Sequence, residues 1–256
     1  MALQSLDIFL RTSVVLLQKF DSGHDEVIMK IGIIGTGMVG RAFATRLAGL
    51  GHDVVIGTRN VAVTLARTKP DNKGISPFST WFVNNKDIPL VSLQEAGTHG
   101  ELIINATEGV NSLNAFRITG SENLRGKTIL DLALPLSYSD NRPPHLSFAN
   151  DDSLGEQMQR LLPESHVVKS LNTMSFPVML EPSRLPAPHN VFISGDNVDA
   201  KNIVCNLLSE LGWPEESIMD LGGIISARGT EMYANLLFYV AQVKQSYDFN
   251  ISIISN

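Results

Sequence analysis

Three glycines, Gly35, Gly37 and Gly40, form a G-x-G-x-x-G pattern directly after the short apolar run at residues 30–34. Gly35 permits a tight turn, Gly37 lets backbone N–H groups approach a pyrophosphate, and Gly40 lets a helix pack closely on the strand. The N-terminus of that helix presents a partial positive charge to the phosphates. The pattern therefore predicts a dinucleotide site made of Gly35, Thr36, Gly37, Met38, Val39 and Gly40.

The residues after the next apolar run indicate which dinucleotide binds. An NAD enzyme usually carries Asp or Glu there, about 20 residues beyond the glycines, to bind the ribose hydroxyls. This chain has Gly57, Thr58, Arg59 and Asn60 instead. No carboxylate repels a phosphate, and a hydroxyl with a planar guanidinium can bind one. We therefore predict NADP as the cofactor, with Thr58, Arg59 and Asn60 at its 2′-phosphate. The alternative is that Arg59 merely follows a surface strand.

The elements that must position these residues follow from hydrophobic periodicity. Val39, Phe43, Leu47 and Leu50 have helical spacing, and Gly51 ends that helix before a strand at residues 53–56. Further apolar runs at residues 88–91, 101–106, 127–132 and 166–171 are separated by segments long enough for crossover helices. The sequence thus predicts an α/β fold with a Rossmann-type, doubly wound parallel sheet.

The predicted domain organisation has three parts. Residues 30–188 form the NADP-binding Rossmann domain, which ends in a proline-rich stretch. Residues 189–256 contain two strand and two helix patterns and are expected to form a small C-terminal α/β cap. Residues 1–29 are interpreted as an N-terminal extension, because Met29 stands directly before the first strand and suits a natural start. A packing or dimerisation arm is the other interpretation.

Ligands of such sheets lie at the carboxyl ends of the strands. These ends correspond to residues 106–108, 133–135 and 172–174, which we predict to form the wall around the nicotinamide. Ala106 and Thr107 are assigned to cofactor binding, and Thr107, Pro135 and Asn172 to the place where the hydride is transferred. For Asn172 the alternative is a loop amide that bonds its own backbone.

Other chemistry finds less support in the sequence. Lys169 lies within an apolar strand, where a buried lysine can act as a base, but a position at the strand edge with the amine in solvent is favoured. The six histidines and the single Cys205 show no metal-ligand spacing, so no metal site is expected. A G-x-S-x-G nucleophile motif is also absent from the sequence.

Composition limits the partners. A net charge of −6 without a basic run argues against nucleic acid, and 43% hydrophobic residues suit a globular enzyme. The apolar run at residues 235–241 is too short to cross a membrane, so we expect a soluble protein. One cysteine is consistent with a reducing compartment, and we expect the cytoplasm.

Five segments together resemble the deazaflavin (coenzyme F-420)-dependent NADP reductase family. They are the glycine turn and residues 57–60, 167–173, 192–196 and 226–231, and the resemblance runs from residue 30 to about residue 243. It implies hydride exchange between NADPH and a small-molecule acceptor, a flavin or deazaflavin ring stacked on the nicotinamide, in what we expect to be a homodimer.

Two features qualify this resemblance. Where this chain has Asn172, the family carries a histidine, so another acceptor is conceivable. Arg228 and Glu231 match an Arg-x-x-Glu pair of the family and, three residues apart on a helix, can pair with each other, so a structural role is favoured over a catalytic one.

Two other functions remain open at this point. A pyrroline-carboxylate reductase or hydroxyacid dehydrogenase shares the glycine turn but requires a larger, all-helical C-terminal half, which the strand pattern at residues 190–194 opposes. A binding protein that senses NADPH without turnover also fits the lack of an obvious catalytic acid. Turnover with flavins distinguishes the sensor from the reductase.

Overall fold

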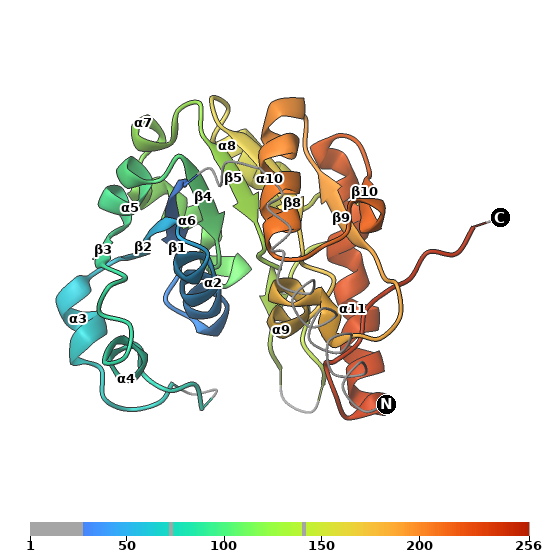
Figure 1. Cartoon of the computed structure of the whole chain (residues 1–256), viewed down its shortest axis with the longest axis horizontal. Coiled ribbons are helices and arrows are strands. Elements are labelled where there is room, and N and C mark those ends of the chain that lie inside the picture. The colour runs from blue at the N-terminus through green and yellow to red at the C-terminus, as the bar shows by residue number, and fades with distance from the viewer. Residues whose placement is uncertain (1–27, 72–73, 140–141, 256) are drawn as a thin grey trace, which may run out of the picture.

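The computed structural model describes residues 28–71, 74–139 and 142–255. Its centre is an eight-stranded sheet whose strand order reverses direction between β1 and β4, as in a doubly wound fold (Figure 1). From one edge to the other the strands are β10 (Ile218–Asp220), β9 (Val191–Ser194), β8 (His166–Ser170), β5 (Thr128–Asp131), β4 (Leu102–Asn105), β1 (Lys30–Ile34), β2 (Asp53–Thr58) and β3 (Leu90–Ser92).

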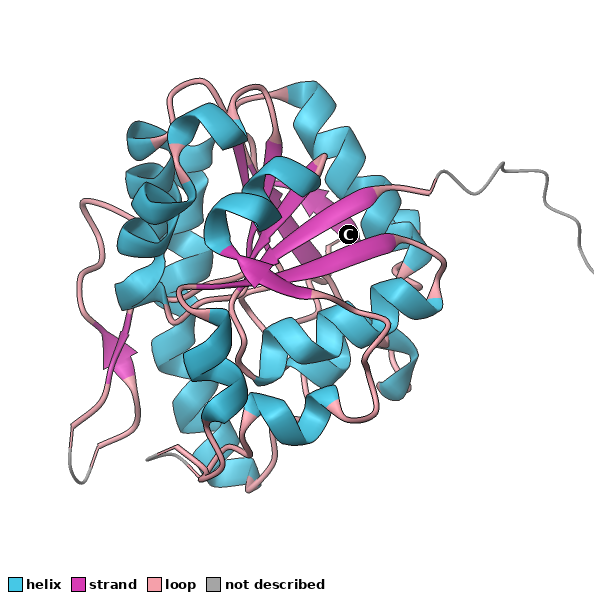
Figure 2. Cartoon of the chain, turned by 90° about the vertical axis from the view of Figure 1, so that its left-hand side faces the viewer, coloured by secondary structure: helices cyan, strands magenta, loops and turns pink. Residues whose placement is uncertain are grey.

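Helices cover both faces of this sheet (Figure 2). Successive side chains of a strand point to opposite faces, so Ile33 and Ile104 join one buried cluster while Ile34 and Ile103 join the other. The first cluster includes side chains of α2 (Met38–Gly49), α9 (Phe176–Leu180) and α10 (Val198–Glu210). The second includes side chains of α5 (Leu93–His99), α6 (Gly109–Thr119), α8 (Leu154–Leu161) and α11 (Ala227–Lys244).

Shorter elements complete the described chain. They are α3 (Val61–Ala66), α4 (Phe78–Phe82), α7 (Ser121–Leu124), a two-stranded hairpin of β6 (Leu136–Ser137) and β7 (His145–Leu146), and the 3-10 turns η2 (Pro182–Arg184), η3 (Glu215–Ser217) and η4 (Ile224–Ser226). The N-termini of α5, α8 and α10 are capped by Ser92, Ser153 and Asn197, respectively. Each of these side-chain oxygens accepts a backbone N–H of the first helical turn. The Rossmann-type α/β fold predicted from the sequence is confirmed.

The C-terminal region differs from the expected separate cap. β9 pairs antiparallel with β8, and β10 pairs parallel with β9, so residues 189–256 widen the same sheet. The strands from β1 to β8 that belong to this sheet are parallel, as predicted from the sequence, and the antiparallel junction is the one at which β9, expected in the cap, joins them. A short buried strand has the same apolar pattern in either direction, and only its connection decides how it pairs. The predicted boundary at residue 188 falls within one continuous sheet, and the predicted extension at residues 1–29 lies almost wholly outside the described residues.

Candidate active site

The glycine turn joins β1 to α2, and two of its glycines are required by the fold itself. Gly35 has a φ of +132°, and a Cβ there would lie 2.4 Å from the carbonyl oxygen of Ala106. A Cβ on Gly40 would lie 2.2 Å from the carbonyl oxygen of Gly35. Neither distance is tolerable for a real side chain, so both positions demand glycine whether or not a ligand binds.

Gly37 is different from its two neighbours in the motif. Its φ of −74° and ψ of −177° suit any residue, and a Cβ there would meet no protein atom within 4 Å. Neither conformation nor packing thus requires glycine at this exposed position. A close approach by a ligand at the N-terminus of α2 is what the missing side chain permits, and a pyrophosphate fits that place.

Arg41 fixes the conformation of this turn, a role that the sequence analysis missed. Its Nε donates to the carbonyl oxygen of Thr36 at 2.8 Å, and its Nη1 donates to that of Ser76 at 2.8 Å. The guanidinium lies 5.5 Å from the ring centre of Phe78, and burial lowers the pKa of Arg41 below its ordinary value. An arginine in the first turn after the glycines was the available signal, but Ser76 and Phe78 are remote from it in sequence.

The end of β2 places three predicted cofactor residues in three different settings. Thr58 is 8% exposed, and its hydroxyl bonds that of Thr64 at 2.8 Å. The side-chain oxygen of Asn60 accepts the N–H of Val63 and so caps α3. Arg59 is exposed, and no hydrogen bond or ion pair with another described residue holds its guanidinium. Of the three, Arg59 has the side chain free to meet a phosphate.

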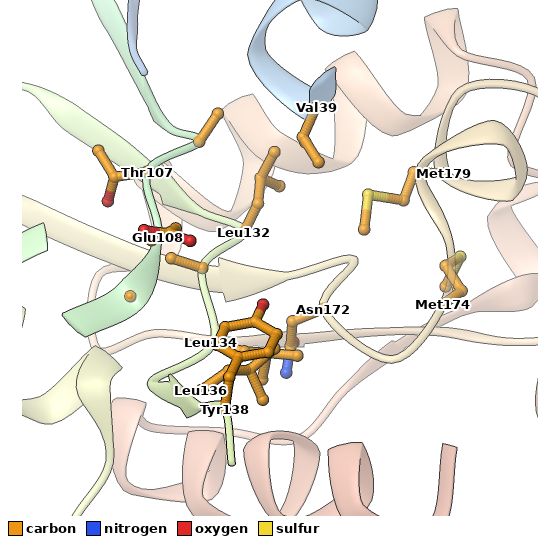
Figure 3. A pocket seen from close by; sticks show the side chains of 13 residues that line it. Val39, Thr107, Glu108, Leu132, Leu134, Leu136, Tyr138, Asn172, Met174 and Met179 are labelled. Carbon is orange, nitrogen blue, oxygen red and sulfur yellow. The ribbon is translucent and has the colours of Figure 1, made fainter. Parts of the chain in front are cut away.

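A cavity of about 230 Å³ opens at the carboxyl ends of β4, β5 and β8 (Figure 3). Most of the residues that line it are apolar. The full lining consists of Val39, Ala106, Thr107, Glu108, Gly109, Leu132, Ala133, Leu134, Leu136, Tyr138, Asn172, Met174 and Met179. Val39 brings the first turn of α2 to the cavity wall. The strand ends predicted from the sequence thus meet here, except that neither Pro135, which was assigned to the hydride-transfer place, nor Thr173 lines the cavity.

Asn172 contributes an unusual polar group to this wall. The residue is 2% exposed, and its Nδ2 is buried without a hydrogen-bond partner among the described residues. No backbone cap of the kind considered for this residue holds that amine. An unpaired buried amide costs free energy, which a ligand with the complementary group recovers.

Thr107 is held rigidly at the opposite part of the cavity. Its hydroxyl donates to Oδ1 of Asn105 at 2.8 Å and lies 2.6 Å from the hydroxyl of Ser112. Asn105 in turn donates to Oδ1 of Asp131 at 2.8 Å. These hydrogen bonds connect the end of β4 to the end of β5, which are two of the predicted wall segments.

Lys169 continues this network, and its predicted position at a solvent-facing strand edge is wrong. The side chain is 1% exposed, in β8 at the middle of the sheet. Its Nζ lies 3.0 Å from Oδ2 of Asp131 and 2.9 Å from Oε1 of Glu231, and it also donates to the carbonyl oxygen of Ala133. Burial alone lowers the pKa of Lys169, but the two carboxylates outweigh that effect and raise it.

Glu231 and Arg228 do not pair with each other, although each makes a structural contact to another element. Glu231 accepts the N–H groups of Leu154 and Gly155, at the N-terminus of α8, in addition to binding Lys169. Arg228 instead forms a two-pronged pair with Glu156, at 2.8 and 2.7 Å, which holds the pKa of that carboxyl below its usual range. Glu231 and Arg228 of α11 thus each bind α8, through different partners.

The described residues contain no group of three or more His, Cys, Asp or Glu side chains placed to hold a metal ion. None of the helices in residues 28–71, 74–139 and 142–255 has the length and apolar character needed to cross a membrane.

A glycine turn with open space at Gly37, together with an apolar cavity at the strand ends, is typical of dinucleotide-dependent α/β proteins. The profile of the family described as coenzyme F420-dependent NADP oxidoreductases matches residues 30–135. An F420-dependent NADP reductase of Methanocaldococcus jannaschii is 27% identical over 216 residues, which are 82% of this chain and 91% of that protein.

Two further proteins are similar. A candidate F420-dependent NADP reductase from Arthrobacter sp. FB24 has a solved structure with 43% identity and a TM-score of 0.83, covering 89% of this chain and 100% of that chain. Metalloreductase STEAP3 of Rattus norvegicus is 30% identical over 205 residues, which are 79% of this chain and 36% of that protein. The chain belongs to the F420-dependent NADP oxidoreductase family and is an NADP-dependent oxidoreductase.

Proposed function

We propose that this protein transfers a hydride between NADP(H) and a flavin or deazaflavin ring. The observation that carries the proposal is the apolar cavity, which begins beside Val39 in the first turn of α2 and extends along the ends of β4, β5 and β8. A dinucleotide whose pyrophosphate lies at Gly37 has its nicotinamide end directed to this edge of the sheet. Family membership and the similarity to the M. jannaschii reductase support the same acceptor class.

The predicted cofactor residues are assigned to different parts of NADP. Gly37 and the first N–H groups of α2 face the pyrophosphate, because no side chain obstructs that approach. Arg59 binds the 2′-phosphate, and its exposed guanidinium is suited to a two-pronged contact. Ala106 and Thr107 border the nicotinamide. Thr58 and Asn60 shape the end of β2 through their bonds to Thr64 and Val63.

The cavity residues position two rings and exclude water. Bound NADPH supplies the hydride, a pair of electrons with its proton, and the oxidised ring accepts it while a second proton comes from water. Aliphatic side chains such as Leu132, Leu134 and Met179 favour flat, apolar rings in face-to-face contact. Proximity and orientation then carry the rate, and the protein need not transfer a proton itself.

The test is turnover by the purified chain. NADPH oxidation is followed at the nicotinamide absorbance band with riboflavin, FMN, a deazaflavin, an imino acid and a keto acid as acceptors. We expect reduction of the three-ring compounds alone, with a shallow pH profile near neutrality. Reduction of an imino or keto acid with a bell-shaped profile would contradict the proposal, because that profile indicates an essential acid or base. Binding of NADPH without reduction of any acceptor would instead identify a sensor.

A further inference from the structure

The side-chain amide of Asn172 is the polar feature of the cavity that the protein leaves unpaired. Asn172 follows β8, lines the cavity and is 2% exposed, and its Nδ2 has no hydrogen-bond partner among the described residues. Thr107, also in the wall, has its hydroxyl committed to Asn105 and Ser112. A buried amide without a partner is costly, so a ligand group that satisfies it gains that free energy on binding.

The chemistry of an amide limits what can satisfy it. Asn172 offers a carbonyl oxygen beside an amine, and a half turn about its terminal bond exchanges the two. The complementary ligand edge therefore carries a carbonyl oxygen next to an N–H, in the plane of the ring. Lactam and imide edges have this arrangement, and the pyrimidine ring of flavins and deazaflavins ends in one.

The location of Asn172 favours the acceptor over the cofactor as its partner. Figure 3 shows Val39 and Asn172 separated across the cavity, with Leu136 and Tyr138 on the Asn172 side. Val39 belongs to the turn that receives the pyrophosphate, so the cofactor enters from that side. The Asn172 side remains for the second ring.

We propose that Asn172 selects the hydride acceptor by pairing its amide with a carbonyl and an adjacent N–H on the edge of the acceptor ring. This inference rests on the proposed function. It makes Asn172 a specificity-determining residue, and it excludes flat three-ring acceptors without such an edge from tight binding, although not from reduction.

The experiment compares two ligands on two proteins. Lumiflavin has the imide N–H, and 3-methyllumiflavin has a methyl group in its place. Binding of each is measured by quenching of flavin fluorescence with saturating NADP+, for the unmodified chain and for Asn172→Leu. We expect the methylated flavin to bind the unmodified chain about tenfold more weakly than lumiflavin. With Asn172→Leu the two flavins should bind equally, and NADP+ affinity should stay unchanged.

Thr173→Val is the matched control. Thr173 also has a buried hydroxyl without a partner among the described residues, but it does not line the cavity. This variant should keep the tenfold preference of the unmodified chain. Phenazine methosulfate is a three-ring hydride acceptor without a carbonyl, so Asn172→Leu should lose less of its rate with this acceptor than with lumiflavin, once the uncatalysed rate is subtracted.

The outcomes separate this inference from the proposed function. If the unmodified chain neither binds nor reduces lumiflavin or a deazaflavin, both are overturned, and if it reduces a deazaflavin but does not bind lumiflavin, the role of Asn172 alone is overturned. If lumiflavin is reduced but the two flavins bind the unmodified chain equally, the role of Asn172 alone is overturned, even should Asn172→Leu fail to fold. An equal loss for both flavins and phenazine methosulfate in Asn172→Leu would assign the amide to the nicotinamide and overturn the inference as well.

Discussion

The glycine turn and the Lys169 cluster lie at the same edge of the sheet, but they depend on opposite kinds of interaction. At the turn, Gly35, Gly37 and Gly40 act through missing side chains, which leave room for the backbone of Ala106 and of the turn itself. In the cluster, Lys169 acts through a charged side chain that joins β5, β8 and α11. The comparison teaches that the glycine motif of the turn can be recognised in a short stretch of sequence, whereas the buried charges that connect the strands of the cavity wall cannot.

The largest expected effect is the loss of the buried lysine. Lys169→Met removes the cation between Asp131 and Glu231 and leaves two buried carboxylates facing each other. Breaking a buried pair typically costs about 3–5 kcal/mol. Denaturant unfolding of the variant should show a loss of this size.

The compensated variant provides the control for this prediction. Lys169→Met with Asp131→Asn carries one buried carboxylate fewer and should recover part of the lost stability. A loss below about 1 kcal/mol in the single variant, typical of an exposed pair, would mean that the cluster does not hold the cavity wall.

The second largest effect is expected from a matched pair of substitutions in the glycine turn between β1 and α2. Gly40→Ser places a Cβ against the Gly35 carbonyl and should cost about 1–3 kcal/mol of stability. Gly37→Ser should leave the free energy of unfolding within about 0.5 kcal/mol, because serine is a preferred residue at the start of a helix. It should nevertheless weaken NADPH binding at least about tenfold. Calorimetric titration measures the NADPH affinity, and denaturant unfolding measures the stability. Unchanged NADPH affinity in Gly37→Ser would contradict the prediction that the pyrophosphate binds at this turn.

The cofactor preference should depend on one exposed guanidinium. Arg59→Ala should weaken NADPH binding about tenfold or more and leave NADH binding unchanged, since a charge-assisted hydrogen bond is worth about 1.5–3 kcal/mol. Arg67→Ala, at the end of α3, makes the same charge change at another exposed arginine and should have little effect. Equal affinity of the unmodified chain for NADPH and NADH would rule out this role of Arg59.

The smallest expected effect concerns the ion pair of Arg228 and Glu156, which connects α11 to α8. Arg228 lowers the pKa of Glu156, so this carboxylate stabilises the fold above its unfolded pKa, and that stability disappears as the pH falls through the lower folded pKa. Glu156→Gln should therefore cost up to about 1 kcal/mol at neutral pH and progressively less in acid.

The pair of Arg125 and Glu164 serves as a comparison, because both of its side chains are largely exposed. Glu164→Gln should change the unfolding free energy by less than Glu156→Gln at neutral pH. A constant difference between Glu156→Gln and the unmodified chain at all pH values would show that the carboxylate charge is not the cause.

The sequence by itself determined the local parts of this protein. The first βαβ unit was predictable because the glycine motif, the positive φ of Gly35 and the apolar spacing of α2 are local features. The strand ends at Ala106, Thr107 and Asn172 follow from the parallel pattern. The family was recognisable for the same reason, since its motifs are short and contiguous.

Only the tertiary structure decided the rest, because the decisive partners are remote in sequence. Lys169 reads as an isolated charge until β5 and α11 place Asp131 and Glu231 beside its Nζ. Glu231 accepts a backbone N–H at the N-terminus of α8, and Arg228 binds Glu156 instead of Glu231. The spacing of the two residues on one helix cannot predict these partners. The antiparallel β9 is a further case, since a four-residue buried strand carries no signal of direction. Periodicity reports which side chains are buried, whereas the identity of their neighbours is a property of the folded chain.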